Sequence, residues 1–300
     1  IRGFSYDYAY DPIGNRVSST EYDHENNPLL TSYTTNALNQ YEQRTIPGYA
    51  TVRGSATNTA TVTVNGNPTW RLDDYFYGSD EADNSTAALM KELAIIAAHS
   101  NHYAAATGHV FVAHTPETFT YDEDGNLTQD GRFTYTWDAE NRLIGVTTRD
   151  DLPVAVPRIR VTHSYDHKSR RIATATAVWT NNIWQPTESR TITYDDWNAI
   201  SEVLSPESCV PSTNLYVWGI DLSGSPQGAG GIGGLLSAIF GNTASLYTYD
   251  ANGNVGQLID PDGDLLAHYE YDPFDKTIVS SGSLALANPF RFSTKYWDNV

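Results

Sequence analysis

The sequence predicts an all-β fold of stacked antiparallel β-hairpins, and three observations support this. The dipeptide Tyr-Asp occurs eight times in 300 residues, where chance would produce one or two copies. A second aromatic residue often stands two positions before the Tyr, and a Gly or Asn follows three or four positions after the Asp. Internal repetition of this kind indicates the architecture before any single motif does.

Each copy of the repeat is typical of one hairpin. The clearest copies lie at residues 8–17, 119–127, 135–143 and 246–255, and residues 163–172 form a degraded copy. Aromatic residues at alternate positions place both rings on one face of a strand. The Asp can cap backbone N–H groups and the Gly accepts a positive φ, as a tight turn requires.

We therefore expect the most informative residues to be structural. They are the aromatic residue before each turn, the Asp that opens the turn, and the Gly or Asn that ends it. The predicted aromatic rungs and turn residues are Tyr10, Asp11, Gly14, Tyr121, Asp122, Gly125, Asn126, Trp137, Asp138, Tyr249, Asp250, Gly253, Asn254, Tyr271 and Asp272.

A lone hairpin is only marginally stable in water, so the units must stack to bury their aromatic faces. Aromatic pairs stacked across strands would each contribute roughly 0.5–1.5 kcal/mol beyond burial. The spacing between copies is irregular, with 16 residues from Tyr121 to Trp137 and 22 from Tyr249 to Tyr271. Variable spacing favours a winding β-strip over a solenoid with fixed rungs.

The repeat divides the chain into three parts: YD repeats at residues 1–49, an interruption at 50–118, and further repeats at 119–300. Within the interruption, an Asn65-Gly66 turn between apolar, β-branched runs predicts strands. Residues 85–99 carry apolar side chains at helical spacing and predict one helix. We expect residues 50–118 to be a small inserted β domain with one helix, tolerated at a hairpin tip.

Composition limits the function. The chain has 18 basic and 36 acidic residues, a net charge of −18, and no basic cluster. This argues against nucleic-acid binding and against docking on anionic lipid, and no apolar run is long enough to insert into a membrane. A single cysteine, Cys209, excludes an internal disulfide or a multi-cysteine zinc site, and we interpret it as an inert loop thiol.

Several motifs resemble catalytic or ligand sites without their full context. The glycine-rich stretch 228–233 satisfies a dinucleotide pattern but lacks the βαβ surroundings, so we expect a packed apolar loop. Residues 122–126 and 260–264 resemble calcium loops but have Gly at the wrong position, and four histidines within residues 99–114 match no metal motif. No catalytic constellation can be assembled, so we expect no enzyme activity, cofactor or metal.

The repeats resemble those of the RHS family, also called the YD-repeat family, which includes toxin-complex C components and teneurin YD shells. The likeness covers residues 1–49 and 119–300. Residues 216–236, 269–274 and 288–298 resemble the RHS repeat-associated core and the stretch that leads into it. Because residue 1 is Ile and no leader pattern follows, we expect the chain to be an excerpt of a longer protein.

The resemblance implies a hollow β-shell that encapsulates or presents a variable C-terminal cargo domain of the same polypeptide, often a toxin. It also implies a secreted or cell-surface bacterial protein. Family members release the cargo by cleavage at an Asp-Pro motif, which Asp11-Pro12 and Asp272-Pro273 match only in part. Two alternatives remain: a carbohydrate-binding adhesion module that uses the aromatic residues, and a self-cleaving enzyme.

Overall fold

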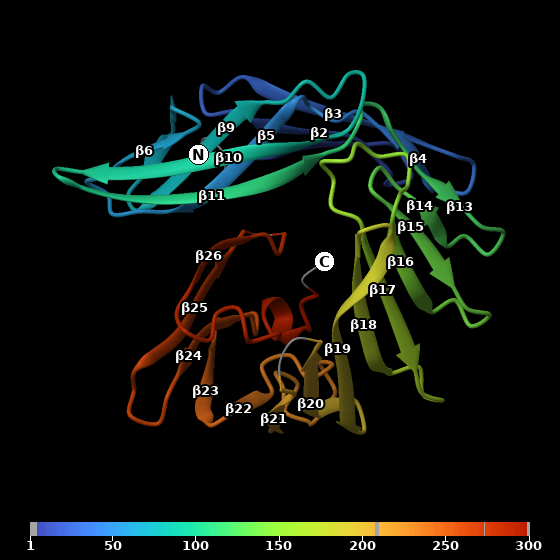
Figure 1. Ribbon diagram of the computed structural model, residues 1–300, viewed down its shortest axis with the longest axis vertical. Helices are drawn as coiled ribbons and strands as arrows, with labels where there is room; N and C mark the ends of the chain where they lie inside the picture. Colours follow the sequence, from blue (N-terminus) through green and yellow to red (C-terminus); the bar gives the residue numbers. More distant parts are fainter. Residues whose placement is uncertain (1–4, 208–209, 273, 299–300) are drawn as a thin grey trace. The chain divides into compact units, whose positions relative to one another are not determined.

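The computed structural model describes residues 5–207, 210–272 and 274–298. The predicted all-β fold is confirmed: strands follow one another along the chain and pair antiparallel (Figure 1). Within the described residues, the only helix is a three-residue 3₁₀ turn, η1 (Phe292–Thr294). The chain divides into two compact units, Ile1–Arg158 and Ile159–Val300.

The first unit contains four groups of paired strands. Three are sheets with the strand orders β1-β2-β3-β4-β12, β11-β10-β6-β7 and β5-β9-β8, and the fourth is the consecutive row β13 to β16. The strands are β1 (Asp7–Tyr10), β2 (Arg16–Tyr22), β3 (Pro28–Thr35), β4 (Tyr41–Arg44), β5 (Tyr49–Ser55), β6 (Thr61–Val64), β7 (Asn67–Pro68), β8 (Trp70–Leu72), β9 (Tyr75–Glu81), β10 (Leu89–His99), β11 (His102–Val112), β12 (Glu117–Thr118), β13 (Thr120–Tyr121), β14 (Leu127–Gln129), β15 (Phe133–Trp137) and β16 (Leu143–Thr148).

The second unit is one row of strands in chain order, each antiparallel to the next. They are β17 (Ile159–Tyr165), β18 (Arg171–Thr180), β19 (Ile183–Asp195), β20 (Asn198–Pro206), β21 (Ser212–Trp218), β22 (Leu235–Phe240), β23 (Thr243–Tyr249), β24 (Val255–Ile259), β25 (Leu265–Tyr271) and β26 (Thr277–Ser281). Figure 1 shows the row curving around the segment that contains η1.

The helix predicted at residues 85–99 is wrong. Leu89–His99 form strand β10, which pairs with β11 along its whole length and with β6 on its other side. Leu93 is buried there beside Val64 and Val112 in a core shared between strands. A short apolar run fits either period, and pairing on two sides outweighed the weak helical spacing.

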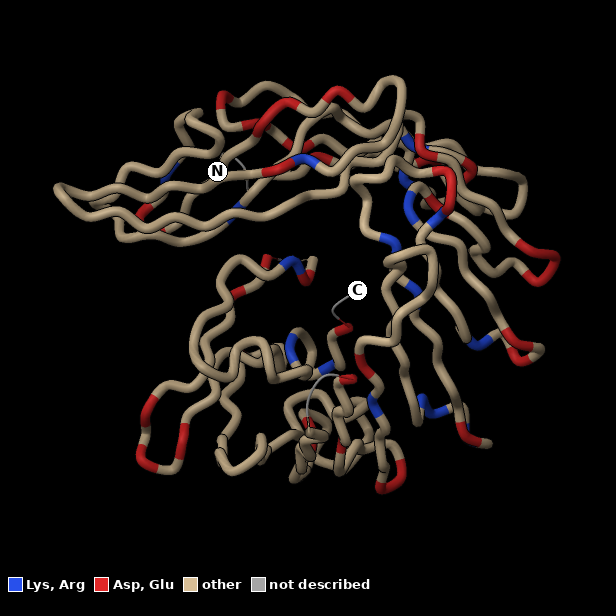
Figure 2. Tube along the Cα trace, viewed as in Figure 1, with Lys and Arg blue, Asp and Glu red and all other residues tan. Residues whose placement is uncertain are grey.

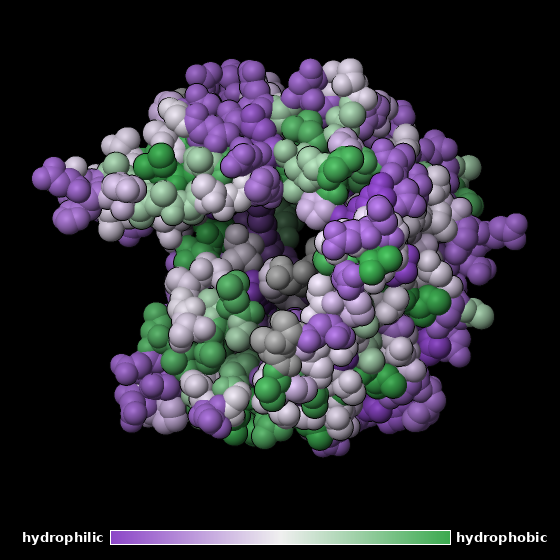
Figure 3. All heavy atoms as spheres, in the orientation of Figure 1, coloured by the Kyte–Doolittle hydropathy of each residue, from purple (hydrophilic) through white to green (hydrophobic). Residues whose placement is uncertain are grey.

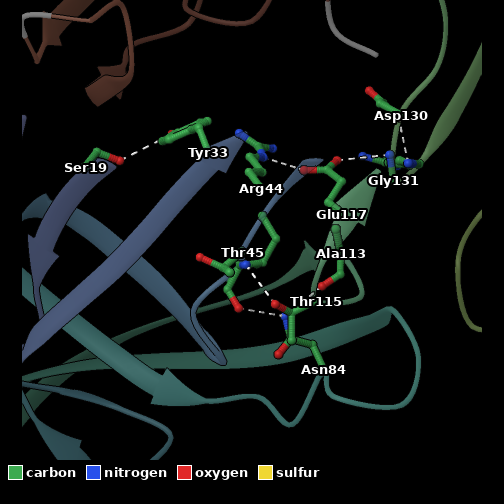
Figure 4. A network of polar contacts seen from close by, with 12 residues as sticks. Ser19, Tyr33, Arg44, Thr45, Asn84, Ala113, Thr115, Glu117, Asp130 and Gly131 are labelled. Atoms are coloured by element: carbon green, nitrogen blue, oxygen red, sulfur yellow. Dashed lines mark hydrogen bonds and ion pairs between the residues drawn. The ribbon is translucent and has the colours of Figure 1, made fainter. Parts of the chain in front are cut away.

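The interruption at residues 50–118 leaves and rejoins the first sheet at neighbouring points. Strand β4 precedes it, and β12, which ends it, pairs with β4 so that Arg44 lies opposite Glu117. Glu117 is 6% exposed; it pairs with Arg44 and accepts a hydrogen bond from the Gly131 amide at 3.0 Å (Figure 4). Asn84 closes the junction by donating to the Ala113 carbonyl at 2.7 Å. The predicted boundaries at residues 49 and 118 differ from the two compact units and remain predictions.

Each unit has its own apolar core. In the first, Ala50, Val64, Ala82, Leu93 and Val112 are buried together. In the second, the buried cluster runs across β19 to β25 and includes Tyr216, Leu235, Tyr247, Leu258, Tyr269 and Phe290. Phe290 comes from the C-terminal segment, so that segment is part of the core.

The acidic residues gather at the ends of the hairpins, where the tube is red in Figure 2. Figure 3 shows the same ends as hydrophilic, for example the turn between β24 and β25 at the lower left. Much of the acidic charge in the net −18 therefore lies in turns at the ends of the hairpins.

Candidate functional site: turns, aromatic rungs and the C-terminal segment

The hairpin turn has one repeated geometry, which residues 122–126 illustrate. The Asp122 amide donates to the Asn126 carbonyl at 3.0 Å, and the Gly125 amide donates to the Asp122 carbonyl at 3.1 Å. Gly125 has a φ of +88°. This is a tight turn closed by a residue in the left-handed region, and the strand register shifts just before it, at Thr120/Tyr121.

Ten turns in the described part of the chain share this pair of backbone hydrogen bonds. The residue at the first position is Asp in nine of them and Asn in one: Asp11, Asp23, Asn36, Asp122, Asp138, Asp166, Asp221, Asp250, Asp260 and Asp272. The residue at the fourth position always has a positive φ, from +58° to +95°: Gly14, Asn26, Asn39, Gly125, Asn141, Ser169, Gly224, Gly253, Gly263 and Asp275. The turn therefore requires a left-handed fourth residue, which Gly and Asn adopt most readily.

The fifth residue of the turn completes it; the sequence analysis predicted Asn126 and Asn254 at this position as turn residues, but not the contacts that they make. Asn126 donates its backbone N–H and its Nδ2 to the two carboxylate oxygens of Asp122, at 2.8 and 3.0 Å. The side-chain hydrogen bond from Asn126 lowers the pKa of Asp122. Arg170 makes the same contacts with Asp166. There, burial acts to raise the pKa, but the hydrogen bonds from Arg170 prevail and the pKa falls to about 2.

The aromatic residue before the turn links neighbouring hairpins. The hydroxyl of Tyr271 donates to the carbonyl of Val255, the first residue after the preceding turn, at 3.0 Å. Six aromatic residues donate in this way: Tyr121 to Tyr41, Trp137 to Leu127, Tyr194 to Arg171, Trp218 to Ala199, Tyr249 to Leu235 and Tyr271 to Val255. Each bond contributes roughly 0.5–1.5 kcal/mol. This use of the rings favours a structural role over a glycan platform.

The aromatic rungs differ in one respect from the expected stacking across strands. The rings stack along a strand, with centroids 6.4 Å apart for Tyr247 and Tyr249 and 6.3 Å apart for Tyr269 and Tyr271. Side chains two residues apart lie on the same face of a strand, which brings these rings together. Tyr10 lies in the edge strand β1, where it is 57% exposed, so that Asp11 and Gly14 form the turn of an edge hairpin.

The glycine-rich loop is organised around its own carboxylate. Asp221 is 5% exposed, and its Oδ2 accepts hydrogen bonds from the amides of Ala229 and Gly231, at 2.7 and 3.1 Å. Burial acts to raise the pKa of Asp221, but hydrogen bonds from Ser223, Ala229 and Gly231 lower it to about 2. The backbone N–H groups that would cradle a phosphate in a nucleotide site are satisfied here by an internal anion.

The C-terminal segment, residues 284–298, lies on the sheet of the second unit, and we call it the anchor segment. Asn288 is fully buried; it accepts a hydrogen bond from Tyr247 at 2.7 Å and donates to the Phe290 carbonyl at 2.7 Å. Phe290 is 4% exposed and contacts the rings of Tyr216 and Trp218 edge to face, at 5.0 and 5.5 Å. The segment adds no strand to the sheet, and it is attached mainly by side chains together with backbone hydrogen bonds such as the one from the Val255 amide to the Arg291 carbonyl, at 3.1 Å.

A buried carboxylate fixes the far end of the anchor segment. Glu202, 2% exposed on β20, accepts hydrogen bonds from the hydroxyls of Tyr296 and Tyr216, the latter at 3.0 Å. Arg190 lies 3.6 Å from the carboxylate and donates to the Tyr296 hydroxyl at 2.7 Å. Burial, followed by the charge of Glu202, raises the pKa of Tyr296 and keeps its proton on the phenol. A buried charge is tolerated because it is fully paired.

Further polar contacts distribute the attachment along the segment. Arg291 is 3% exposed; it donates to the Ala285 carbonyl at 2.9 Å and lies over the Trp297 ring. Thr294 donates to the Gly253 carbonyl at 2.8 Å and accepts from the Gly233 amide at 2.8 Å. Arg171 forms two hydrogen bonds with Asp298, at 2.7 and 3.0 Å. Two predicted turns, 250–254 and the glycine-rich loop, therefore also hold the anchor segment.

The sequence analysis did not find Glu202, Arg190, Asn288 or Arg291. Glu202 and Tyr296 are 94 residues apart, and nothing local predicts that they meet. The available signal was a single acid, Glu202, in a strand whose other residues carry no charge. An acid on the buried face of a strand requires partners, which indicates a polar contact but not its identity.

The other candidate sites remain isolated. In the ranges that the structure describes, no group of three or more His, Cys, Asp or Glu side chains is placed to hold a metal ion. His99 lies opposite His102 across the β10–β11 hairpin, while His109 lies opposite Glu92. Cys209 and Pro273 lie outside the described residues. Nor do the described residues include a helix with the length and apolar character to cross a bilayer.

Two pockets are lined by polar residues. One of about 520 Å³ lies beside the anchor segment and is bordered by Asp250, Asn254, Tyr271, Asp272 and Phe292. Another of about 260 Å³ adjoins the junction of the interruption and is bordered by His114, Glu117 and Arg149. The carboxylates of Asp250 and Glu117 already accept hydrogen bonds from neighbouring chain.

No protein-family model matches the chain. Among curated proteins, it is 30% identical over 184 residues to the tRNA3(Ser)-specific nuclease WapA of Bacillus spizizenii, which is 61% of this chain and 7% of that protein. It is 29% identical over 184 residues to the tRNA nuclease WapA of Bacillus subtilis, with the same coverage. The chain therefore spans less than a tenth of the length of the curated relatives it matches.

Solved structures with a partial likeness come from bacterial toxin complexes. TcdB2-TccC3 without its hypervariable C-terminal region has a TM-score of 0.41 and 14% identity, covering 97% of this chain and 14% of that one. The Photorhabdus luminescens Tc holotoxin pore has a TM-score of 0.44 and 16% identity, covering 98% and 14%. In both cases the likeness concerns a small part of a much larger chain.

The curated relatives correct one expectation from the sequence. The absence of a catalytic constellation predicted a protein that is not an enzyme, yet these relatives are named as tRNA nucleases. The prediction was wrong because it inferred the role of a whole protein from a repeat region. A catalytic part carries its own motifs, and hairpin repeats say nothing about it.

Proposed function

We propose that this chain is part of the wall of an RHS-type shell in a large bacterial toxin, and that the wall encapsulates or presents a C-terminal cargo. The observation that carries the proposal is the anchor segment. Within residues 288–298, the buried side chains of Asn288, Arg291 and Thr294 and the hydroxyl of Tyr296 are hydrogen-bonded to the rest of the unit or within the segment. A chain continuing beyond such an anchor starts from a fixed point on the wall.

The wall itself is supported by the repeated turn and the aromatic links. Neighbouring hairpins are joined by strand pairing, and six aromatic residues add a hydrogen bond to a backbone carbonyl of the preceding hairpin. Such contacts can be repeated for any number of hairpins, because each unit presents the same carbonyl to the next. The mechanism is containment: paired strands exclude solvent and proteases from whatever they enclose.

The relatives support a toxin role and suggest the type of cargo. They are named as tRNA nucleases, so we propose a nuclease cargo and a secreted or cell-surface location for the parent protein. We also propose that residues 50–118 are an insertion between two neighbouring hairpins. The pairing of β12 with β4 and the hydrogen bond from Tyr121 to Tyr41 support this.

The test uses the full-length parent protein, with Glu202→Gln as the variant. Glutamine keeps the shape of the side chain but removes the charge that accepts from Tyr216 and Tyr296. We expect trypsin to cleave after Arg291 and Lys295 much faster in the variant, and the purified variant to cleave tRNA faster than the wild type. Glu207→Gln is the control, because Glu207 is an exposed acid near the end of the same strand.

Two results would count against the proposal. Equal trypsin sensitivity at Arg291 in all three proteins would show that the segment is not anchored as described. Normal anchoring in the wild type, with tRNA cleavage as fast as that of the isolated C-terminal part, would show that the wall does not restrain its cargo.

A further inference from the structure

Strand β11 is a long edge strand that no described strand covers. It is the end of the sheet ordered β11-β10-β6-β7, and it pairs with β10 over eleven positions without a shift in register. Its first eight residues, 102–109, are all exposed, and Tyr103 is 79% exposed. Figure 1 shows the β10–β11 hairpin extending to the left of the view.

Natural sheets protect such edges, and β11 lacks the usual protections. Edge strands are blunted by short length, by proline, by bulges, or by charged side chains, Lys above all. Three other edge strands of this chain show such protections. Strand β7 is two residues long and contains Pro68, and β8 is three residues long and contains Arg71. Strand β1 is four residues long, and its pairing with β2 has a register shift. Strand β11 has none of these features, so its outward N–H and C=O groups form a ready template for another strand.

Beyond Glu92 in β10, the hairpin is also free of fixed charge. No Asp, Glu, Lys or Arg occurs between Glu92 and Glu117, in a chain with 54 such residues and a net charge of −18. The tip of the hairpin is tan in Figure 2, unlike the acidic ends of other hairpins. Two copies of a chain with this net charge repel each other, and this strip lacks the fixed charges that would oppose their approach along β11.

We propose that β11 is a self-association edge, at which β11 of a second copy pairs antiparallel to form a two-fold dimer. A two-fold contact brings the same residues of both copies together. A register centred on Ala105 or Ala106 places alanine opposite alanine and sets Tyr103 opposite Thr107 or His109. Neither register creates a pair of like fixed charges, and Tyr103 gains a cross-strand neighbour on the shared face.

Sedimentation velocity at pH 7.5 tests the proposal on the whole chain, and we expect a shift from monomer toward dimer between about 10 and 500 µM. The variant Ala105→Lys should stay monomeric over this range, because it places two like charges next to the two-fold axis. The matched control is Ala98→Lys, which adds the same charge to the same hairpin on β10, a strand with neighbours on both sides.

The proposal is overturned if the wild type stays monomeric at every concentration, or if Ala105→Lys dimerises as well as Ala98→Lys does. If Ala105→Lys loses its β-type circular dichroism spectrum, Thr107→Lys replaces it as the test. Thr107 lies two residues further along β11, on the same face of the strand. A dimer that survives Thr107→Lys in a folded protein would place the contact elsewhere and overturn the proposal equally.

Discussion

At the scale of single residues, the molecule depends on a five-position turn in which each position has a separate task. The first carboxylate gathers N–H groups, the fourth residue adopts a positive φ, and the fifth returns side-chain donors to the first. Sequence patterns predicted the first and fourth positions, because Asp and Gly have strong turn preferences. At the fifth position only Asn126 and Asn254 were predicted, because residue types as different as Gln40, Arg170 and Lys276 also occupy it.

Replacing Gly125 by Val tests the turn. A β-branched residue at a φ of +88° is strained, and its Cβ would lie 3.2 Å from Gln40 Nε2. We expect a loss of about 1–3 kcal/mol in the free energy of unfolding, measured by urea denaturation. Gly125→Asn should lose less, because Asn holds the same position at residues 26, 39 and 141.

The control for this change is Gly108→Val. Gly108 lies in β11, and a Cβ there would meet no atom within 4 Å. We expect its effect on stability to be close to zero. Equal losses for Gly125→Val and Gly108→Val would contradict the turn assignment.

His163 gives the second unit a predicted dependence on pH. Burial lowers the pKa of His163, and the charge of Arg171 lowers it further, against a smaller opposing effect of Asp298. The unfolded chain therefore binds this proton more readily than the folded chain. The contribution of His163 to the free energy of unfolding is fully present above the pKa of about 6.5 that a histidine has in the unfolded chain. It is lost as the pH falls through the lower pKa of His163 in the folded chain.

Thermal unfolding measured between pH 7.5 and 5 checks this expectation. The melting temperature of the wild type should fall with pH, and His163→Gln should show a shallower fall. His167→Gln is the control, because His167 is exposed in the neighbouring turn. A slope that is unchanged in His163→Gln would show that another group causes it.

At the scale of elements, hairpins were predictable because their signals are local. The aromatic alternation and the turn lie within about ten residues of each other, and the structure forms a hairpin at each clear copy. The predicted helix at residues 85–99 failed for the opposite reason. Pairing with β6 and β11 made that run a strand. Both strands lie outside residues 85–99, the stretch in which the helical spacing of apolar residues was counted.

Excising the interruption tests its status as an insertion. Replacing residues 45–116 with Asn-Gly would place a two-residue turn between Arg44 and Glu117, which already lie opposite each other. We expect the shortened chain to be less stable, because it loses one apolar core, but still to unfold cooperatively with a β-type circular dichroism spectrum.

Tyr121→Phe serves as the internal control in both chains. Its hydroxyl donates to Tyr41, across the point of excision. Loss of this hydrogen bond should cost about 1 kcal/mol in the intact and in the shortened chain alike. No effect in the shortened chain, or no cooperative unfolding, would mean that the hairpins on either side do not form a sheet by themselves.

At the scale of the whole molecule, the most consequential contacts join residues far apart in the sequence. The anchor segment meets β18, β20, β23 and both neighbouring turns, over separations of 41 to 127 residues. Its resemblance to the core of a known repeat family indicated that it matters. Only the structure identifies Glu202 and Asn288 as the buried polar groups that hold it. Contacts between residues so far apart in the sequence produce no repeating pattern that could predict them.

Removing the partner of the buried carboxylate should be more harmful than removing an exposed ion pair. Tyr296→Phe leaves Glu202 without one of its donors, at a cost of about 1–3 kcal/mol in unfolding free energy. Lys168→Gln breaks only the exposed pair with Asp196, and we expect a loss below about 1 kcal/mol. Urea denaturation compares the two, and equal losses would contradict the burial of the Glu202 network.

The central claim is that side chains of the second unit's sheet hold residues 288–298 in place. Hydrogen exchange followed by mass spectrometry measures this directly on the wild-type chain. The account predicts slow exchange at Phe290, Ser293 and Trp297, whose amides donate to Asn288, Asn254 and Pro289. It also predicts faster exchange there in Glu202→Gln but not in Glu207→Gln. Exchange of these amides in the wild type at the rate of an unstructured peptide would contradict it.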